Sequence, residues 1–158
     1  MRLSMTQQTK KPLWKCPRCS ARFVTANSWH SCGKNTLKVL FAKSDPHVIR
    51  VFRRFEKLVR SCGRVTMIPQ KTRVAFMVRV RFAGAYPRKS HLLCGLGLPR
   101  RIRHPKLVKY QAYAPHFRGH LFRIDSEKDF DNRFLSLLRE SYGVGTQEYL
   151  KKSKVRIS

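Results

Sequence analysis

Acidic residues are scarce in this sequence. Its 158 residues include 8 Asp and Glu against 35 Lys and Arg, for a formal net charge of +27 at pH 7. No carboxylate occurs between Glu56 and Asp125, and phosphoryl transfer assisted by Mg²⁺ needs clustered carboxylates to hold the metal. This absence argues against a nuclease of that type, and we expect a protein that is not an enzyme. A Cys94 nucleophile paired with His91 or His120 stays open as an alternative, although nothing in the spacing selects it.

Long apolar runs are also absent. No stretch approaches the roughly 18 residues that a membrane-spanning helix needs, and the N-terminus shows no secretory apolar region. Five cysteines are present, and three of them belong to one motif, which leaves Cys62 and Cys94 unpaired. Unpaired cysteines are typical of a reducing compartment. We therefore expect a cytoplasmic protein that does not associate with membranes.

What the sequence does contain is a metal-binding motif in the segment 14–33. Cys16, Cys19, His30 and Cys32 follow the pattern C-x₂-C-x₁₀-H-x-C. The Cys-Pro-x-Cys turn places two sulfurs on one metal, and the second pair completes the tetrahedron that Zn²⁺ takes with three thiolates and one imidazole. The alternative, a redox dithiol of the first two cysteines, leaves the other two residues unexplained. We predict a zinc knuckle, held folded by its metal because so short a segment has little core.

The excess of positive charge is uneven along the chain. Residues 1–124 hold 28 basic residues but only two acids, Asp45 and Glu56, whereas residues 125–158 are nearly balanced. A polyanion is the expected counterpart, and nucleic acid is the commonest one. We favour RNA over DNA, with the ribosome among the candidates. A protein partner, docking on the acidic last helix or on exposed aromatics, is the alternative.

Basic residues gather in four segments that could contact phosphates. They are a proline-bounded loop at 99–106, a turn at 87–90, one face of a strand at 73–82 and the polar face of a helix at 46–62. The candidate nucleic-acid-binding residues are Arg100, Arg101, Arg103, Lys106, Arg88, Lys89, Arg79, Arg81, Arg50, Arg53, Arg54, Lys57 and, for stacking on a base, Trp29.

Periodicity predicts two helices. In the first, Ser44 or Asp45 is the N-cap and Gly63 ends the helix, and apolar residues recur at helical spacing from Val48 to Val59. The second begins at a capping box, Ser126 with Asp129, and ends near Tyr142 and Gly143.

Between the helices the pattern changes to strands. Segments 64–69, 73–82, 91–98, 107–114 and 120–124 alternate or are rich in β-forming residues. In the third of these Gly95 and Gly97 share one face, which permits close approach by a helix, another backbone or a ligand, of which a helix is the commonest. We predict an α+β fold with a mostly antiparallel sheet, divided into a flexible basic arm (1–13), the knuckle (14–33), the α+β domain (34–143) and a basic tail (144–158).

These motifs resemble those of an uncharacterised bacterial family, in which a zinc knuckle precedes an α+β domain similar to the YdhG-like and YjbR-like proteins. The resemblance implies an antiparallel sheet with helices packed on it, related to an arrangement used elsewhere for nucleic-acid binding, and it supplies no activity. The residues that carry it are Trp14, Cys16, Pro17, Cys19, His30, Cys32, Gly33, Lys71, Thr72, Val74, Ala75, Phe76, Phe82, Ala83, Pro87, Arg88, Lys89, Leu92, Gly95, Leu96, Leu98 and Pro99.

Overall fold

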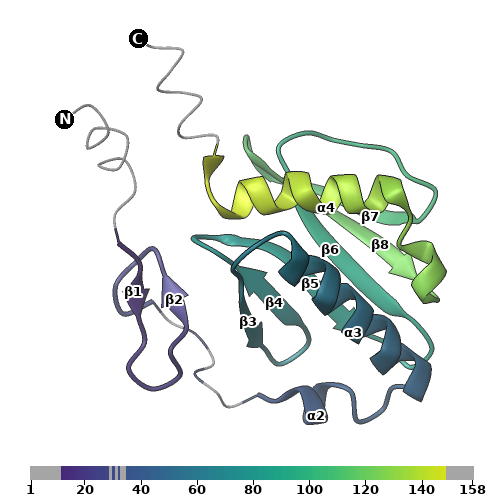
Figure 1. The fold of residues 1–158 in the computed structure, drawn as a ribbon, viewed down its shortest axis with the longest axis horizontal. Coiled ribbons are helices and arrows are strands. Elements are labelled where there is room, and N and C mark those ends of the chain that lie inside the picture. Colours follow the sequence, from purple (N-terminus) through teal and green to yellow (C-terminus); the bar gives the residue numbers. More distant parts are fainter. Residues whose placement is uncertain (1–11, 29, 31, 33–34, 149–158) are drawn as a thin grey trace.

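The structure, a computed structural model, describes residues 12–28, 30, 32 and 35–148. Its main body is a six-stranded antiparallel sheet in the order β3-β4-β5-β6-β8-β7, with two long helices across one face (Figure 1). Trp29 and most of the predicted arm and tail lie outside the described residues. The elements are β1 (Trp14–Lys15), β2 (Arg22–Phe23), α2 (Leu37–Leu40), α3 (Pro46–Ser61), β3 (Thr66–Pro69), β4 (Val74–Met77), β5 (Arg81–Pro87), β6 (Leu92–Leu98), β7 (Leu107–Ala114), β8 (Phe117–Ile124), a 3₁₀ turn η1 (Glu127–Asp129) and α4 (Asn132–Gly145).

The core lies between the two helices and one face of the sheet, which confirms the predicted fold class. The stripe on α3 is buried as its spacing predicts, because apolar residues three and four apart share one side of a helix. On β6 the alternate residues Leu92, Cys94, Leu96 and Leu98 face the helices and are fully buried. Aromatic rings join the layers, since Phe122 of β8 packs edge-on against Phe134 of α4. Among the described residues no helix is long and apolar enough to cross a membrane.

The prediction of one strand from 73 to 82 is wrong. The segment forms two antiparallel strands, β4 and β5, joined at 78–80. The alternation of apolar residues continues through Val78 and Val80, so the sequence pattern gives no sign of the turn. A tertiary contact explains it: the backbone N–H groups of Arg79 and Val80 both donate to the carbonyl of Gly145, at the end of α4. Satisfying these groups away from the ladder allows the chain to reverse here.

The predicted capping box is present, but it does not start the long helix. Ser126 and Asp129 cap η1, and α4 begins later, with the side chain of Asp131 accepting the N–H of Phe134 at 2.8 Å. The helix also runs slightly past its expected end near Gly143, to Gly145. Both ends therefore differ from the sequence prediction, and Phe134, Leu137 and Leu138 of α4 are buried in the core.

His120 is a buried polar residue of this core, 2% exposed. Its Nδ1–H donates to the carbonyl of Arg118 at 2.9 Å, and its Nε2 accepts the N–H of Ile102 at 3.1 Å. Both ring nitrogens are thus engaged, and the ring is neutral. Burial lowers the pKa of His120, and burial is also the largest cause of the lowered pKa values of His91 and His104.

The lowered histidine pKa values predict that acid destabilises the fold. Above the unfolded-state pKa of about 6.5 these histidines are neutral in both states, and their contribution to the stability of the fold is fully present. That contribution is lost as the pH falls, because the unfolded chain then binds protons more readily than the folded chain does. We expect the midpoint of urea unfolding to drop between about pH 7.5 and about pH 5.5. His120→Gln, whose amide can make the same two hydrogen bonds without titrating, should show a shallower drop. An equal drop in both proteins would contradict this role of His120.

Candidate metal centre and candidate nucleic-acid interface

The four predicted metal ligands come together beside the small β1–β2 hairpin. Cys16 and Cys19 lie in its turn, where the N–H of Ser20 donates to the carbonyl of Cys16 at 2.9 Å and the N–H of Cys16 donates to that of Ala21 at 2.8 Å. Ser20 has a φ of 65°, a left-handed conformation that lets the chain turn directly after the second cysteine. This local geometry aims both sulfurs to the same side, where His30 and Cys32 meet them.

The distances within this cluster fit a tetrahedral metal site. The four ligand atoms all lie within 4.8 Å of one another. The Sγ atoms of Cys16 and Cys32 are 3.7 Å apart, close to the edge of about 3.8 Å expected for two sulfurs bound to one zinc ion, and too far for a disulfide of about 2.05 Å. The Sγ of Cys19 is 3.2 Å from Nε2 of His30. Nδ1 of His30 lies 2.8 Å from the carbonyl of Ser28, which fixes that nitrogen as the donor and turns Nε2 towards the sulfurs.

The electrostatics of the cluster favour a thiolate at its first position. Hydrogen bonds from the backbone of Cys19 and, less strongly, of Arg18 lower the pKa of Cys16 to about 6, against the opposing effect of burial. Burial, followed by the hydrogen bond with Cys16, raises the pKa of Cys32. Two thiols that share one site cannot both ionise easily without a cation between them. The donor set is complete with four ligands, so the cluster could hold a metal ion and would leave it no open position.

This metal-ligand module packs on the side of the sheet that the helices leave uncovered. Ala21 and Phe23 form a small buried cluster with Ile68 of β3 and Met77 of β4. Ile68 pairs with Ala75 of β4 across the ladder. Ala75 in turn pairs with a glycine of β5, and that glycine pairs with one of β6, so all of them lie on the uncovered face. The ring of Phe23 also contacts that of His30, at a centroid distance of 4.6 Å and tilted by 33°. The aromatic residues of the module therefore connect the metal ligands to the sheet.

The structure spreads the predicted phosphate-contacting cations over several surfaces. Those of α3 project from the helical layer, where Glu56 already pairs with Arg53 at 2.9 Å and with Arg60 at 3.1 Å. The turn carrying Arg88 and Lys89 packs on the start of α3, since the N–H of Asp45 donates to the carbonyl of Lys89. The loop 99–106 contacts α4 through Arg100 and Glu140, and the sheet through Ile102 and His120.

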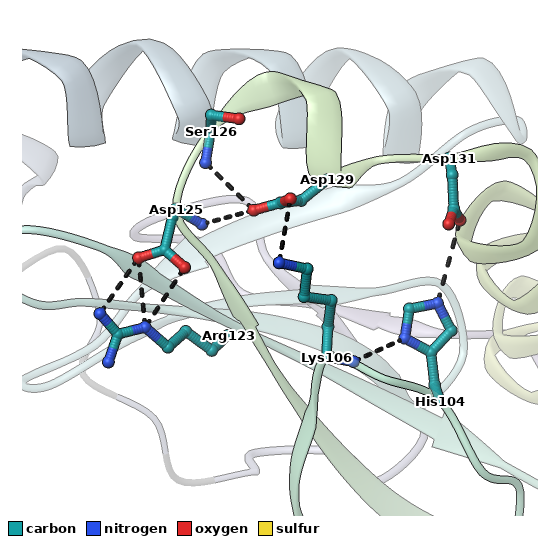
Figure 2. A network of polar contacts seen from close by, with 7 residues as sticks. All are labelled: His104, Lys106, Arg123, Asp125, Ser126, Asp129 and Asp131. Carbon is teal, nitrogen blue, oxygen red and sulfur yellow. Dashed lines mark hydrogen bonds and ion pairs between the residues drawn. The ribbon is translucent and has the colours of Figure 1, made fainter.

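Cations of the loop 99–106 have partners inside the protein. Arg100 makes a bidentate pair with Glu140 of α4, at 2.9 and 3.1 Å, and the guanidinium of Arg101 lies over the ring of Tyr110 at 4.5 Å. Figure 2 shows that Lys106 points at Asp129, with Nζ 3.3 Å from the carboxylate. Burial of Asp129 is outweighed by hydrogen bonds from backbone N–H groups and from Lys106, so the pKa of Asp129 is below its usual value. Three of the four cations in this loop therefore have partners within the protein, although Arg100, Arg101 and Arg103 all remain exposed.

A second group of cations, which sequence reasoning did not assemble, surrounds a hollow on the uncovered face. The hollow has a volume of about 580 Å³ and crosses β5, β6, β8 and β7. Arg73, Arg81, Arg88 and Lys109 line it, and only two of these are among the predicted contacts. All eight acidic residues of the chain are described, and none of them lines the hollow. It is thus a concave surface with positive charge and no internal counter-charge.

Glycines form much of the floor of this hollow. Contrary to the commonest of the expected explanations, no helix in the described part of the chain covers Gly95 and Gly97, because α3 and α4 pack on the opposite face. Aromatic rings take that place: a Cβ on Gly97 would come within 2.5 Å of the ring of Phe117, and one on Gly119 within 2.6 Å of the ring of Tyr113. The missing side chains let these rings lie down on the sheet. The glycines at alternate positions predict that another group approaches this face closely, but they do not predict that this group consists of aromatic rings.

Comparison with known families covers the sheet and both long helices. Residues 38–145 match a family described as a domain of unknown function (DUF5655). The match begins in α2 and ends at the last residue of α4, so it takes in the whole body and leaves the metal-ligand module outside. No curated protein and no solved structure matches the chain.

Proposed function

The chain belongs to this DUF5655 family, whose description assigns no activity, and we propose from its own residues that it is a non-catalytic, zinc-containing nucleic-acid-binding protein. It contacts the phosphate backbone with weak sequence preference and binds RNA, including ribosomal RNA, in preference to DNA. The observation that carries this proposal is the cationic hollow on the uncovered face of the sheet, which no carboxylate lines. An open sheet face with exposed aromatic rings and cations suits single-stranded or unpaired nucleotides.

Zinc is the metal that we propose for the Cys₃His cluster. Three soft sulfurs and one imidazole in a compact arrangement select zinc over magnesium or calcium, which prefer oxygen ligands. A full set of four protein ligands suits a structural ion, which holds the module against β3 and β4. The position of this module, on the same side of the sheet as the hollow, supports a role in extending the nucleic-acid surface.

Two observations support a protein without catalytic activity. Cys94 is fully buried beneath the helices, and burial raises the pKa of its thiol well above the usual value, which disfavours a reactive thiolate. His120, one of its two suggested partners beside His91, has both ring nitrogens engaged with the backbone. We further propose that the protein acts in the cytoplasm and that its body is related to the bacterial YdhG-like and YjbR-like proteins, on the motifs they share.

Binding to several unrelated oligonucleotides tests this function. Because phosphate contacts position a strand without reading its bases, fluorescence anisotropy at low salt should give affinities within about tenfold for unstructured RNAs of different sequence. The DNA versions of the same strands should bind more weakly. Absence of binding to every strand would refute the proposal, and so would binding confined to one sequence.

A further inference from the structure

We propose that the hollow on the uncovered sheet face is a site for one nucleotide unit, with its phosphate between Arg73 and Arg81 and its base against the rings of Tyr113 and Phe117. This inference rests on the proposed function and assigns it a place and a ligand. The shared chemistry is that of a nucleoside phosphate, which can come from a free mononucleotide or from a nucleotide within an RNA strand.

The phosphate end of the site is built around two guanidinium groups. Nε of Arg73 donates to Oε1 of Gln70 at 2.8 Å, and its Nη1 donates to the hydroxyl of Tyr86 at 2.6 Å. These bonds fix the plane of the group and leave its other terminal nitrogen available, since a guanidinium has five N–H donors. Arg73 therefore offers an oriented donor rather than a mobile charge.

Arg81 completes this end of the site. It is half-buried, and burial followed by the charge of Arg73 lowers the pKa of its guanidinium. Within the described part of the chain, Arg81 has neither a hydrogen-bond acceptor nor a carboxylate partner for its side chain. Two neighbouring cations without a counter-ion repel each other, and a phosphate with several acceptor oxygens would relieve that repulsion.

The other end of the hollow is shaped for a flat apolar group. The rings of Tyr113 and Phe117 lie 6.1 Å apart and rest over Gly119 and Gly97, where a side chain would displace them. Between this aromatic wall and Tyr86, Gly95 leaves the floor open, because a Cβ there would meet its neighbours only at 3.6 to 3.8 Å. The volume of about 580 Å³ is in the range of small-molecule sites. Stacking on aromatic rings accepts any base, in keeping with weak sequence preference.

The test uses the full-length, zinc-loaded protein with two kinds of probe. Calorimetry measures the binding of a nucleoside 5′-monophosphate, of ribose 5-phosphate and of the nucleoside, and anisotropy measures the binding of a labelled unstructured RNA. The double variant Arg73→Gln, Arg81→Gln is compared with Lys128→Gln, Arg139→Gln on η1 and α4, which removes the same charge from exposed residues away from the hollow. Gly95→Val, which fills the floor without changing charge, is compared with Gly95→Ala, whose single methyl group fits.

We expect the mononucleotide to bind better than either of its two parts. The sheet-face double variant and Gly95→Val should each weaken its binding at least about tenfold. Gly95→Ala should weaken it less, and the control double variant on η1 and α4 should leave it unchanged. If RNA binds but both double variants weaken it equally and the mononucleotide does not bind, this inference is wrong and the proposed function stands. If the mononucleotide binds in the hollow but RNA does not bind, the site stands and the proposed function is wrong.

Discussion

Removal of the metal is expected to unfold the segment 14–33 and to leave the six-stranded sheet folded. The β1–β2 hairpin has two residues in each strand. Among the described residues its buried cluster consists of Ala21, Phe23, Ile68 and Met77, with Trp14 and Cys19 packed against them. Structural zinc contributes about 10–16 kcal/mol to folding in small zinc-finger peptides, far more than this contact can supply. The main core is a separate cluster, so it does not need the module to stay packed.

Tryptophan fluorescence reports this unfolding directly, because both tryptophans of the chain, Trp14 and Trp29, belong to the segment. A strong chelator should change that signal, while the far-ultraviolet circular dichroism of the body changes little. Metal analysis should find one zinc ion per chain, and Cys16→Ser should lose it. Cys62→Ser is the matched control, since this half-buried thiol lies in the body at the end of α3. Metal-free protein with unchanged tryptophan fluorescence would contradict the structural role of the ion.

Affinity for RNA is expected to fall steeply as salt increases. Each phosphate that the protein neutralises releases condensed counter-ions, and for single strands the slope of log affinity against log salt is about −0.7 per contact. With about six to ten contacts, affinity should fall by roughly two to four orders of magnitude between about 50 and 200 mM salt. A net charge of +27, with eight acids in the whole chain, supplies more than enough cations for that number.

The slope of log affinity against log salt also distinguishes binding at the hollow on the sheet from binding at the loop 99–106. Arg73→Gln with Arg81→Gln should make it shallower, because those guanidiniums are not paired with carboxylates. Arg100→Ala, on the loop 99–106, should change it little, since Arg100 is bound to Glu140. If Arg100→Ala changed the slope more than the double variant did, the RNA would bind at the loop, as the sequence alone predicts.

Features that depend on neighbours in sequence could be predicted. The stripe of α3 follows from residues three and four apart, and the buried face of β6 from residues two apart. The metal ligands could be predicted as well, because Cys16 and Cys19 share one turn and metal chemistry restricts which residue types can supply the remaining ligands. In each of these cases the residues selected by the local pattern are the ones that the folded structure buries or brings together.

Features that depend on distant partners could not be predicted. The turn at 78–80 is explained by the carbonyl of Gly145, more than sixty residues away in the chain. The pairing of Arg100 with Glu140 spans 40 residues, and the sequence around either residue does not predict it. The hollow requires the order β5-β6-β8-β7, in which Tyr86 and Tyr113 reach the same face from strands that are not neighbours in sequence. Alternation assigns residues to a face, but only the sheet order brings these faces together.

The measurement that tests the central claim most directly is the titration of a labelled unstructured RNA with the wild-type protein at several salt concentrations. We predict measurable binding at low salt and a straight, steeply negative line of log affinity against log salt. A flat line, or no binding even in dilute buffer, would contradict the claim that the uncovered cationic face of this sheet is built to bind phosphates.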